Sequence, residues 1–234
     1  LKLPSGRAVS YLVGVTDSPT AHSLNDRLGL LTPNSGGRSR GLAIYAGAIA
    51  LADEATMSQS AAALRAIETV RTDLYEIVLQ SYLFLGFPRM LIAAENLSLA
   101  WPSERPTVAA SSVADFERWK DSVQSLYSHV YGSNAGRLKE RVMSFAPEIF
   151  EWMIVEGYGK VLSRPGLDIV SRERAVVAFL IIDNRPKQLA SHIRGALRVG
   201  GTAAQIADTI DDLKSVAANG AREARRILDQ LGVR

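Results

Sequence analysis

Glu173, Arg185, Gln188 and His192 are the residues of this 234-residue sequence whose types and spacing best suit chemistry. Arg185, Gln188 and His192 follow an i, i+3, i+7 spacing, so on a helix their side chains share one face. Glu173 stands 19 residues before His192, at the start of a strongly apolar run. If that run and the segment after it form two antiparallel helices, the carboxylate and the imidazole can meet.

Such a group of residues could transfer a proton and bind an anion. A carboxylate beside an imidazole in an apolar pocket is a usable acid/base pair, so Glu173 and His192 are the predicted catalytic residues. Guanidinium groups bind carboxylates in a bidentate geometry. The same spacing also fits a structural hydrogen bond that pins two helices together. The predicted substrate-binding residues are Arg164, Arg185 and Gln188, with Arg194 as a further candidate unless it points to solvent.

The helices that must position these residues have recognisable boundaries. The run "AVVAFLII" is apolar on every side, which predicts a helix buried on every side. Ser171 is its expected N-cap, with Glu173 in the first turn. A last helix is expected from Asn219 onward. The boundaries between them are Asn184 or Arg185 with Pro186 at a helix start, Gly200 and Gly201 at its end, and a Thr202–Gln205 capping box that opens the next helix.

The first half is also helical from residue 39, with a helix that restarts after Gly86. Residues 1–38 are rich in Gly, Ser, Pro, Thr and Asn, and predict an irregular arm with at most a short helical turn. The stretch from Trp101 to Ser112 is the expected linker, and residues 113–132 form an amphipathic helix. No alternating apolar pattern bounded by turn signals occurs, so the predicted fold class is all-α.

A weak internal repeat relates the two halves. A shift of 133 residues aligns Ala63-Leu64-Arg65 with Ala196-Leu197-Arg198, and a shift of 134 aligns Gly86 with Gly220. Chance similarity between helices rich in Ala, Leu and Arg is the alternative explanation. We therefore predict an arm over 1–38, a degenerate first repeat over 39–102, and a linker, connecting helices and second repeat over 103–234.

Composition excludes several functions. The absence of cysteine removes disulfides, thiolate metal sites and thiol nucleophiles. Net charge is +3 and the basic residues are scattered, so no nucleic-acid partner is expected. The apolar stretch 41–52 has twelve residues, too few to span a membrane, and predicts a buried helix. No HxH or HxxxH spacing indicates a metal site, and His22 and His129 receive no role. A cytoplasmic location is expected.

The segment "YGKVLSRPGLDIVSRERAVVAFLIIDNRPKQLASHIRGALRVGGTAAQI" (residues 158–206) resembles the core of the carboxymuconolactone decarboxylase family. That superfamily also contains alkylhydroperoxidase D. Four ordered pieces carry the resemblance. They are the "RPGLD" turn, the Arg-Glu pair that opens the buried helix, the "QLxxH" step, and "GALRVGGT" before the next helix.

The resemblance implies an all-helical fold of paired helices that assembles into homo-oligomers, commonly trimers or hexamers. In the peroxidase branch a glutamate, two cysteines and a histidine form a proton relay. Glu173 and His192 match the glutamate and histidine, whereas Arg185 and Gln188 stand at the cysteine places. Without thiols, this chain cannot reduce peroxide by that route.

The decarboxylase branch lacks the cysteine pair, as this chain does. The resemblance therefore implies a carboxy-lyase that removes carbon dioxide from a small carboxylated lactone in aromatic degradation, without metal or organic cofactor. Loss of carbon dioxide leaves a dienolate-like charge, which needs an anion-binding group and a proton donor. His192 would donate the proton, Glu173 would orient it, and Arg185 or Arg164 would bind the carboxylate.

The chain departs from the family pattern in its length. Its first half resembles a degraded copy, with Ser39 or Arg40 at the place of Glu173 and Ser58 or Gln59 at that of His192. We expect an internal pseudo-dimer with one site, walled by Phe87 or Tyr82, and assembly as a trimer of pseudo-dimers. The alternatives are a non-catalytic binding or assembly protein of the same fold, and a thiol-free relative of the peroxidase branch.

Overall fold

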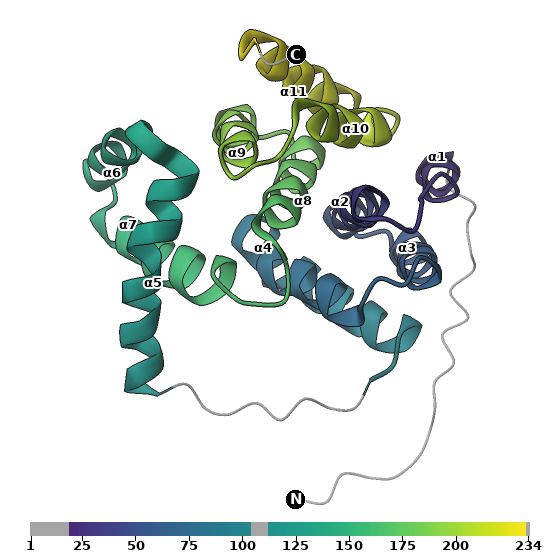
Figure 1. The fold of residues 1–234 in the computed structure, drawn as a ribbon, viewed down its shortest axis with the longest axis horizontal. Helices are drawn as coiled ribbons and strands as arrows, with labels where there is room; N and C mark the ends of the chain where they lie inside the picture. Colours follow the sequence, from purple (N-terminus) through teal and green to yellow (C-terminus); the bar gives the residue numbers. More distant parts are fainter. Residues whose placement is uncertain (1–18, 104–111, 233–234) are drawn as a thin grey trace, which may run out of the picture.

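A computed structural model describes residues 19–103 and 112–232, and this part of the chain is helical without any strand, as the predicted all-α class requires (Figure 1). The elements are α1 (Pro19–Leu28), α2 (Ser35–Leu51), α3 (Glu54–Ala66), α4 (Arg71–Ala100), α5 (Val113–Tyr131), the 3-10 turn η1 (Gly132–Asn134), α6 (Ala135–Met143), α7 (Pro147–Trp152), the π-helical segment η2 (Met153–Leu162), α8 (Ile169–Ile182), α9 (Pro186–Arg198), α10 (Ala203–Leu213) and α11 (Ala218–Gln230).

Helices α2 and α8 pack against each other at the centre of the main core. In α8 every residue from 171 to 181 is buried, and α2 is buried from 41 to 50. Both were predicted as fully buried helices from their continuous apolar runs. Figure 1 shows α3 and α4 beside α2, and α9, α10 and α11 grouped beside α8.

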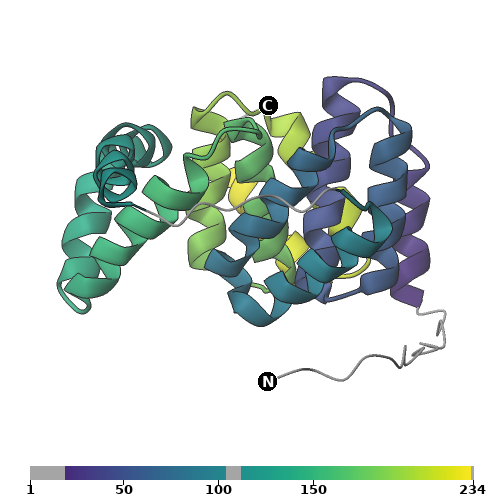
Figure 2. The ribbon, with the colours of Figure 1, turned by 90° about the horizontal axis from the view of Figure 1, so that it is seen from below.

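The helices between the two halves form a separate group. Figures 1 and 2 show α5, α6 and α7 projecting to one side of the main core. A second apolar cluster holds this group together, built mainly from aromatic rings: Tyr127, Tyr131, Phe150 and Tyr158, with Val130 and Leu162.

Cap residues set the helix boundaries around the site. Arg185 is the N-cap of α9 and Pro186 its first residue, and the Thr202–Gln205 capping box opens α10, as predicted. The expected N-cap Ser171 is wrong. Asp168 caps α8 by accepting a hydrogen bond from the Ser171 amide at 2.8 Å, so Glu173 lies in the second turn.

The predicted irregular arm over residues 1–38 is wrong for its described part. Helix α1 is ten residues long, and its Leu24 and Leu28 belong to the main core. Asn34 then caps α2 by accepting a hydrogen bond from the Gly37 amide at 2.8 Å. The local sequence is polar, but two leucines four residues apart suffice to attach one helical face to the core. Residues 1–18 of the arm and 104–111 of the linker lie outside the described residues.

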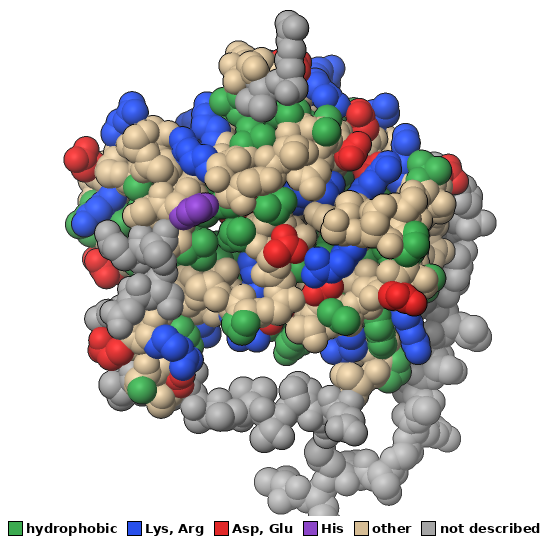
Figure 3. Space-filling view, viewed as in Figure 1, with side chains coloured by type: hydrophobic (Ala, Val, Ile, Leu, Met, Phe, Trp, Pro, Cys, Tyr) green, Lys and Arg blue, Asp and Glu red, His purple; other side chains and the backbone are tan. Residues whose placement is uncertain are grey.

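Helix α4 bends sharply at Gly86, where the predicted restart occurs. Gly86 has φ of 79°, a left-handed conformation that favours glycine, and Pro88 follows in the first turn of the second part. By length and composition α4 could cross a membrane, with a mean hydropathy of 1.5, and 28% of its most apolar stretch is buried. The bend leaves roughly 15 residues on either side, fewer than the ~20 of a typical span. Such a helix is weak evidence for a membrane protein, and over the face shown in Figure 3 charged side chains are interspersed with apolar ones.

The two halves turn at equivalent places. Ala52 after α2 and Asn184 after α8 are both left-handed, with φ of 55° and 51°. Glu68 after α3 and Gly200 after α9 are left-handed as well, with φ of 62° and 101°. Each pair is 132 residues apart, the separation that also relates the contacting Ser39 and Ser171.

This 132-residue offset differs by one or two residues from the offsets of 133 and 134 that the sequence comparison of the two halves used. The hydroxyls of Ser39 and Ser171 lie 3.3 Å apart, so equivalent positions of α2 and α8 meet each other. With that offset Gly41, and not Ser39 or Arg40, stands at the place of Glu173. Ser60, and not Ser58 or Gln59, stands at the place of His192.

Ion pairs join the halves across this interface. Arg40 of α2 donates two hydrogen bonds to Asp212 of α10, at 2.8 and 2.6 Å. At the equivalent place Arg172 of α8 donates to Glu76 and Gln80 of α4, at 2.9 and 3.3 Å. Burial lowers the pKa of Arg172, and the buried Glu76 carboxylate opposes that shift.

Gly220 provides a test of how closely α11 packs on α8. A Cβ at Gly220 would lie 1.9 Å from the Ile181 carbonyl oxygen, which is backbone and cannot rotate away. We expect Gly220→Ala to lower the free energy of unfolding by roughly 2 to 4 kcal/mol in urea titrations. The matched control is Gly136→Ala in α6, where a Cβ meets nothing within 4 Å and better helix propensity should add up to about 1 kcal/mol. Equal effects of the two substitutions would contradict this packing.

Candidate active site

Glu173 and His192 meet, as their spacing predicted. The Nδ1 atom of His192 lies 2.9 Å from Oε2 of Glu173, and the two side chains are 7% and 1% exposed. Helices α8 and α9 form the antiparallel hairpin that brings them together, and its turn passes through the left-handed Asn184. The geometry holds the imidazole by one nitrogen and leaves Nε2 free of that interaction.

The surroundings of this pair are tightly packed. Gly195 lies on the same side of α9, and a Cβ there would stand 3.0 Å from Glu173 Oε2 and 2.9 Å from Val130 Cγ1. The ring of Phe84 from α4 meets the imidazole edge to face, with ring centroids 5.5 Å apart. The first half of the chain therefore contributes a wall to the site through Phe84.

The prediction that Phe87 or Tyr82 forms a wall of the site is wrong. These two rings stack on each other at 4.9 Å, and Phe87 is 58% exposed. The Tyr82 hydroxyl donates to Glu156 of η2 at 2.9 Å. The bend at Gly86 redirects Phe87, which follows it. Tyr82 and Phe84 both precede the bend and stand two residues apart, so they point to opposite sides of the helix.

Two tyrosines that the sequence analysis did not single out lie beside the pair. The hydroxyl of Tyr158 in η2 donates to that of Tyr131 in α5 at 2.9 Å. Burial raises the pKa of Tyr131 to about 12, with a contribution from the Glu173 charge. Burial also raises the pKa of Tyr158 well above its ordinary value. Both phenols therefore keep their protons at neutral pH and can act as hydrogen-bond donors.

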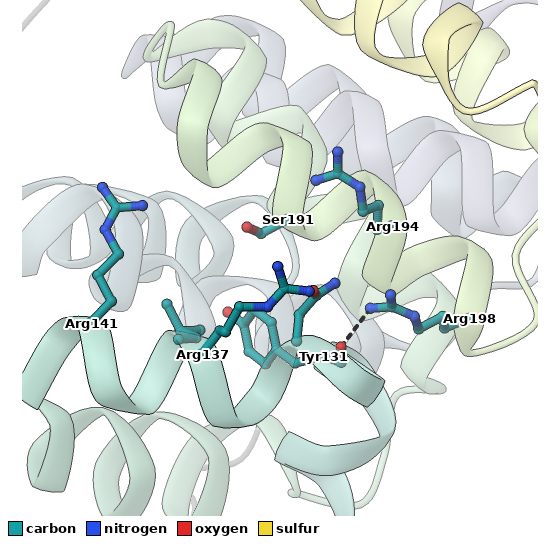
Figure 4. A pocket seen from close by; sticks show the side chains of 8 residues that line it. Tyr131, Arg137, Arg141, Ser191, Arg194 and Arg198 are labelled. Carbon is teal, nitrogen blue, oxygen red and sulfur yellow. Dashed lines mark hydrogen bonds between the residues drawn. The ribbon is translucent and has the colours of Figure 1, made fainter.

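A cavity of about 620 Å³ opens between α9 and the η1–α6 segment (Figure 4). Ser191 and Arg194, which flank His192, line it on one side, and Tyr131 connects it to the surroundings of Glu173. Neither member of the Glu–His pair lines the cavity itself. Its lining residues are Tyr131, Asn134, Arg137, Leu138, Arg141, Ser191, Arg194 and Arg198.

Arg185 and Gln188 do not join the site. Residues 184–188 are all exposed, and Arg185 is 62% exposed with its Nε atom 2.7 Å from Asp183. Arg185 precedes the helix as its N-cap, so the helical spacing that places it on the face of His192 does not apply. Gln188 lies on the exposed first turn of α9, and the buried part of the helix begins after it.

Arg164 is also absent from this cavity, because a buried carboxylate binds it. Its Nε and Nη2 atoms donate to Glu76 at 3.0 Å, and Glu76 binds Arg172 as well. Arg164 lines a different cavity, of about 370 Å³, together with Arg172. Its guanidinium is thus partly neutralised within the fold.

Among the described residues, no other histidine contacts Glu173 or His192. His129 is exposed on α5, and the side chain of His22 is outside the described residues. Within residues 19–103 and 112–232, no group of three or more His, Asp or Glu side chains could hold a metal ion.

The described residues thus form an all-α fold in which the hairpin of α8 and α9 holds the buried Glu–His pair. Residues 147–230, which run from α7 to α11, match the Carboxymuconolactone decarboxylase family. This range contains both Glu173 and His192 and excludes α1 to α6. None of the curated proteins matches the sequence.

The raised pKa of Tyr131 predicts a loss of stability in alkali. Between pH 10 and 12 the unfolded chain releases this proton while the folded protein retains it, so unfolding becomes more favourable as the pH rises. The free energy of unfolding should fall by about 1.4 kcal/mol per pH unit in that window from this group. Chemical denaturation at several pH values measures the slope, and Tyr131→Phe should make it shallower. An unchanged slope in the variant would contradict the assignment.

Proposed function

We propose that the protein is a cofactor-free decarboxylase or isomerase that acts on a small carboxylated lactone or related acid. The observation that carries the proposal is the buried Glu173–His192 hydrogen bond, which lies behind a cavity lined by arginines. The match of residues 147–230 to the family supports the reaction class, and the arginines of the cavity support an anionic substrate.

In the proposed reaction the pair controls one proton. Because Nδ1 of His192 bonds to the Glu173 carboxylate, Nε2 is the nitrogen that exchanges protons with substrate. The substrate carboxylate leaves as carbon dioxide and its bonding electrons remain on carbon as a dienolate. Protonation of the conjugated carbon by His192 Nε2 completes the double-bond shift, and water restores the proton to the imidazole.

The anion-binding role suits Arg194, the further candidate named from the sequence, better than Arg185, Gln188 or Arg164. Arg194 lies on α9 two residues after His192 and lines the cavity, as does Arg198 one turn later. Arg185 and Gln188 face solvent, and Arg164 is bound by Glu76. We therefore assign the substrate carboxylate to Arg194 and Arg198. The phenol of Tyr131, which lines the same cavity, supplies a further neutral donor.

The alternative is a binding protein in which the pair is structural. Its support is the packing of Phe84 against His192 and the small exposed fraction of the imidazole. Under the decarboxylase proposal, by contrast, Tyr131 or α9 must move so that the cavity opens toward Nε2 of His192. A structural pair requires no such movement.

The direct test is to incubate the protein with 4-carboxymuconolactone and follow carbon dioxide release. His192→Ala should lower kcat by roughly 10²- to 10⁴-fold, the usual contribution of general acid/base catalysis. Arg194→Gln should raise KM, because it removes an anion contact from the cavity.

Arg185→Gln is the matched control, because it removes a guanidinium from the same helix at a solvent-exposed place. It should leave kcat and KM within about twofold of the unaltered protein. Unchanged turnover in His192→Ala would rule out the proton-transfer role. No release of carbon dioxide by the unaltered protein would rule out this substrate and favour the binding protein.

We also infer that the two halves are copies of one helical unit with a single surviving site. The support is the shared 132-residue offset of the turns and the Ser39–Ser171 contact. At the place of Glu173 the first half has Gly41, where a Cβ would lie 2.7 Å from Leu64 and 2.8 Å from Leu31. Leucines thus fill the position where the second half keeps a carboxylate.

A homo-oligomer is proposed from the exposed face of α4. Phe87, Leu91 and Leu99 are 58%, 61% and 75% exposed on its second part, an apolar surface of the kind that interfaces cover. We expect a molar mass in light scattering that is a multiple of the 25.3 kDa chain. Leu91→Glu should shift it toward the monomer, and Gln230→Glu on α11 should not. A monomeric unaltered protein would contradict the proposal.

A further inference from the structure

Two matching polar stripes face each other across the cavity beside His192. On α9, Ser191, Arg194 and Arg198 follow an i, i+3, i+7 spacing. On the opposite wall the η1–α6 segment presents Asn134, Arg137 and Arg141 with the same spacing. Each wall therefore carries one small polar side chain and two guanidinium groups. Figure 4 shows Arg137, Arg194 and Arg198 arranged around the same space.

The four guanidiniums have no internal anion to bind. Within the part of the chain that the structure describes, none of them forms an ion pair, and no Asp or Glu lines the cavity. Arg137 donates to Asn134 Oδ1 at 3.1 Å, Arg194 to the Ala190 carbonyl at 3.2 Å, and Arg198 to the Tyr131 carbonyl at 2.8 Å. These bonds use few of the five N–H groups that each guanidinium carries.

The positions of the arginines indicate the shape of the anion that this cavity suits. One carboxylate presents two oxygens in one plane and suits one guanidinium fork. Here the forks come from two opposite walls, so a bound group must offer anionic oxygens in several directions. The outer members of each stripe stand seven positions apart, which is roughly 10 Å along a helix. Phosphate groups joined in series have radially arranged oxygens and fit both conditions.

We propose that this cavity binds a small molecule that carries a diphosphate group. Arg137 and Arg141 hold it from α6, Arg194 and Arg198 hold it from α9, and Ser191 donates a further hydrogen bond. The inference goes beyond the proposed function: Arg194 and Arg198 hold either the diphosphate or the substrate carboxylate, so the two anions compete for one cavity. Binding itself does not require that Glu173 and His192 turn anything over.

Isothermal titration calorimetry of the full chain with inorganic diphosphate and with ADP tests the proposal. We expect saturable binding of one ligand per chain that weakens as salt is added. Arg137→Gln and Arg194→Gln, one from each wall, should each weaken binding by roughly tenfold or more. Citrate and inorganic phosphate should bind at least tenfold more weakly than diphosphate, because neither matches the two-walled arrangement.

Arg222→Gln is the matched control. Arg222 on α11 bonds to Asn219 three residues earlier, as Arg137 bonds to Asn134, but does not line the cavity. Its substitution should leave the affinity unchanged, and circular dichroism should show that all variants are folded. Absence of saturable binding, an equal loss in Arg222→Gln, or equal affinity for citrate would each overturn the diphosphate site. His192→Ala should still bind diphosphate, which separates this result from a failure of the proposed catalysis.

Discussion

The fold depends on the fact that α8, a helix buried on every side, carries four consecutive polar residues. Successive side chains on a helix point about 100° apart, so these four point to different neighbours. Each must find its own partner, because a buried polar group without one is costly. The partners come from four other helices: Ser171 with Ser39 of α2, Arg172 with Glu76 of α4, Glu173 with His192 of α9, and Arg174 with Ser39 of α2 and Thr209 of α10.

This arrangement means that Glu173 serves the fold whether or not it serves catalysis. The pair with His192 is the one polar contact of this set that links α8 to α9 within the hairpin. Arg174 illustrates the cost of such burial. Its partners are hydroxyls rather than carboxylates, and burial lowers its pKa to about 10. A pair with both roles satisfies a structural requirement and holds the imidazole in one orientation, which leaves Nε2 as the nitrogen available for chemistry.

The sequence alone predicted those features of the fold that depend on residues close together in the chain. The apolar run of α8, the proline and glycines around α9 and the 19-residue spacing were enough to place Glu173 beside His192. It failed for Arg164, because a carboxylate 88 residues earlier binds it. It also failed for Phe84, which faces the site because it stands two residues after Tyr82 and so points to the opposite side of the helix. The opposite wall of the cavity lies on α6, more than 40 residues before α9, and only the fold brings the two together. The i, i+3, i+7 spacing of Asn134, Arg137 and Arg141 is nevertheless visible in the sequence.

The position of the cavity lined by arginines follows from the helices that precede α8. Helices α5, α6 and α7, with η1 and η2, stand between the linker and α8. They place Tyr131, Arg137 and Arg141 against α9 and close a space next to His192. In the first half, Leu31 and Leu64 instead occupy the surroundings of Gly41. The surroundings of Gly41 are thus apolar core, whereas a polar wall stands near Glu173. This difference favours a single site on the side of α9, although Ser39 and Ser171 contact each other where α2 and α8 meet.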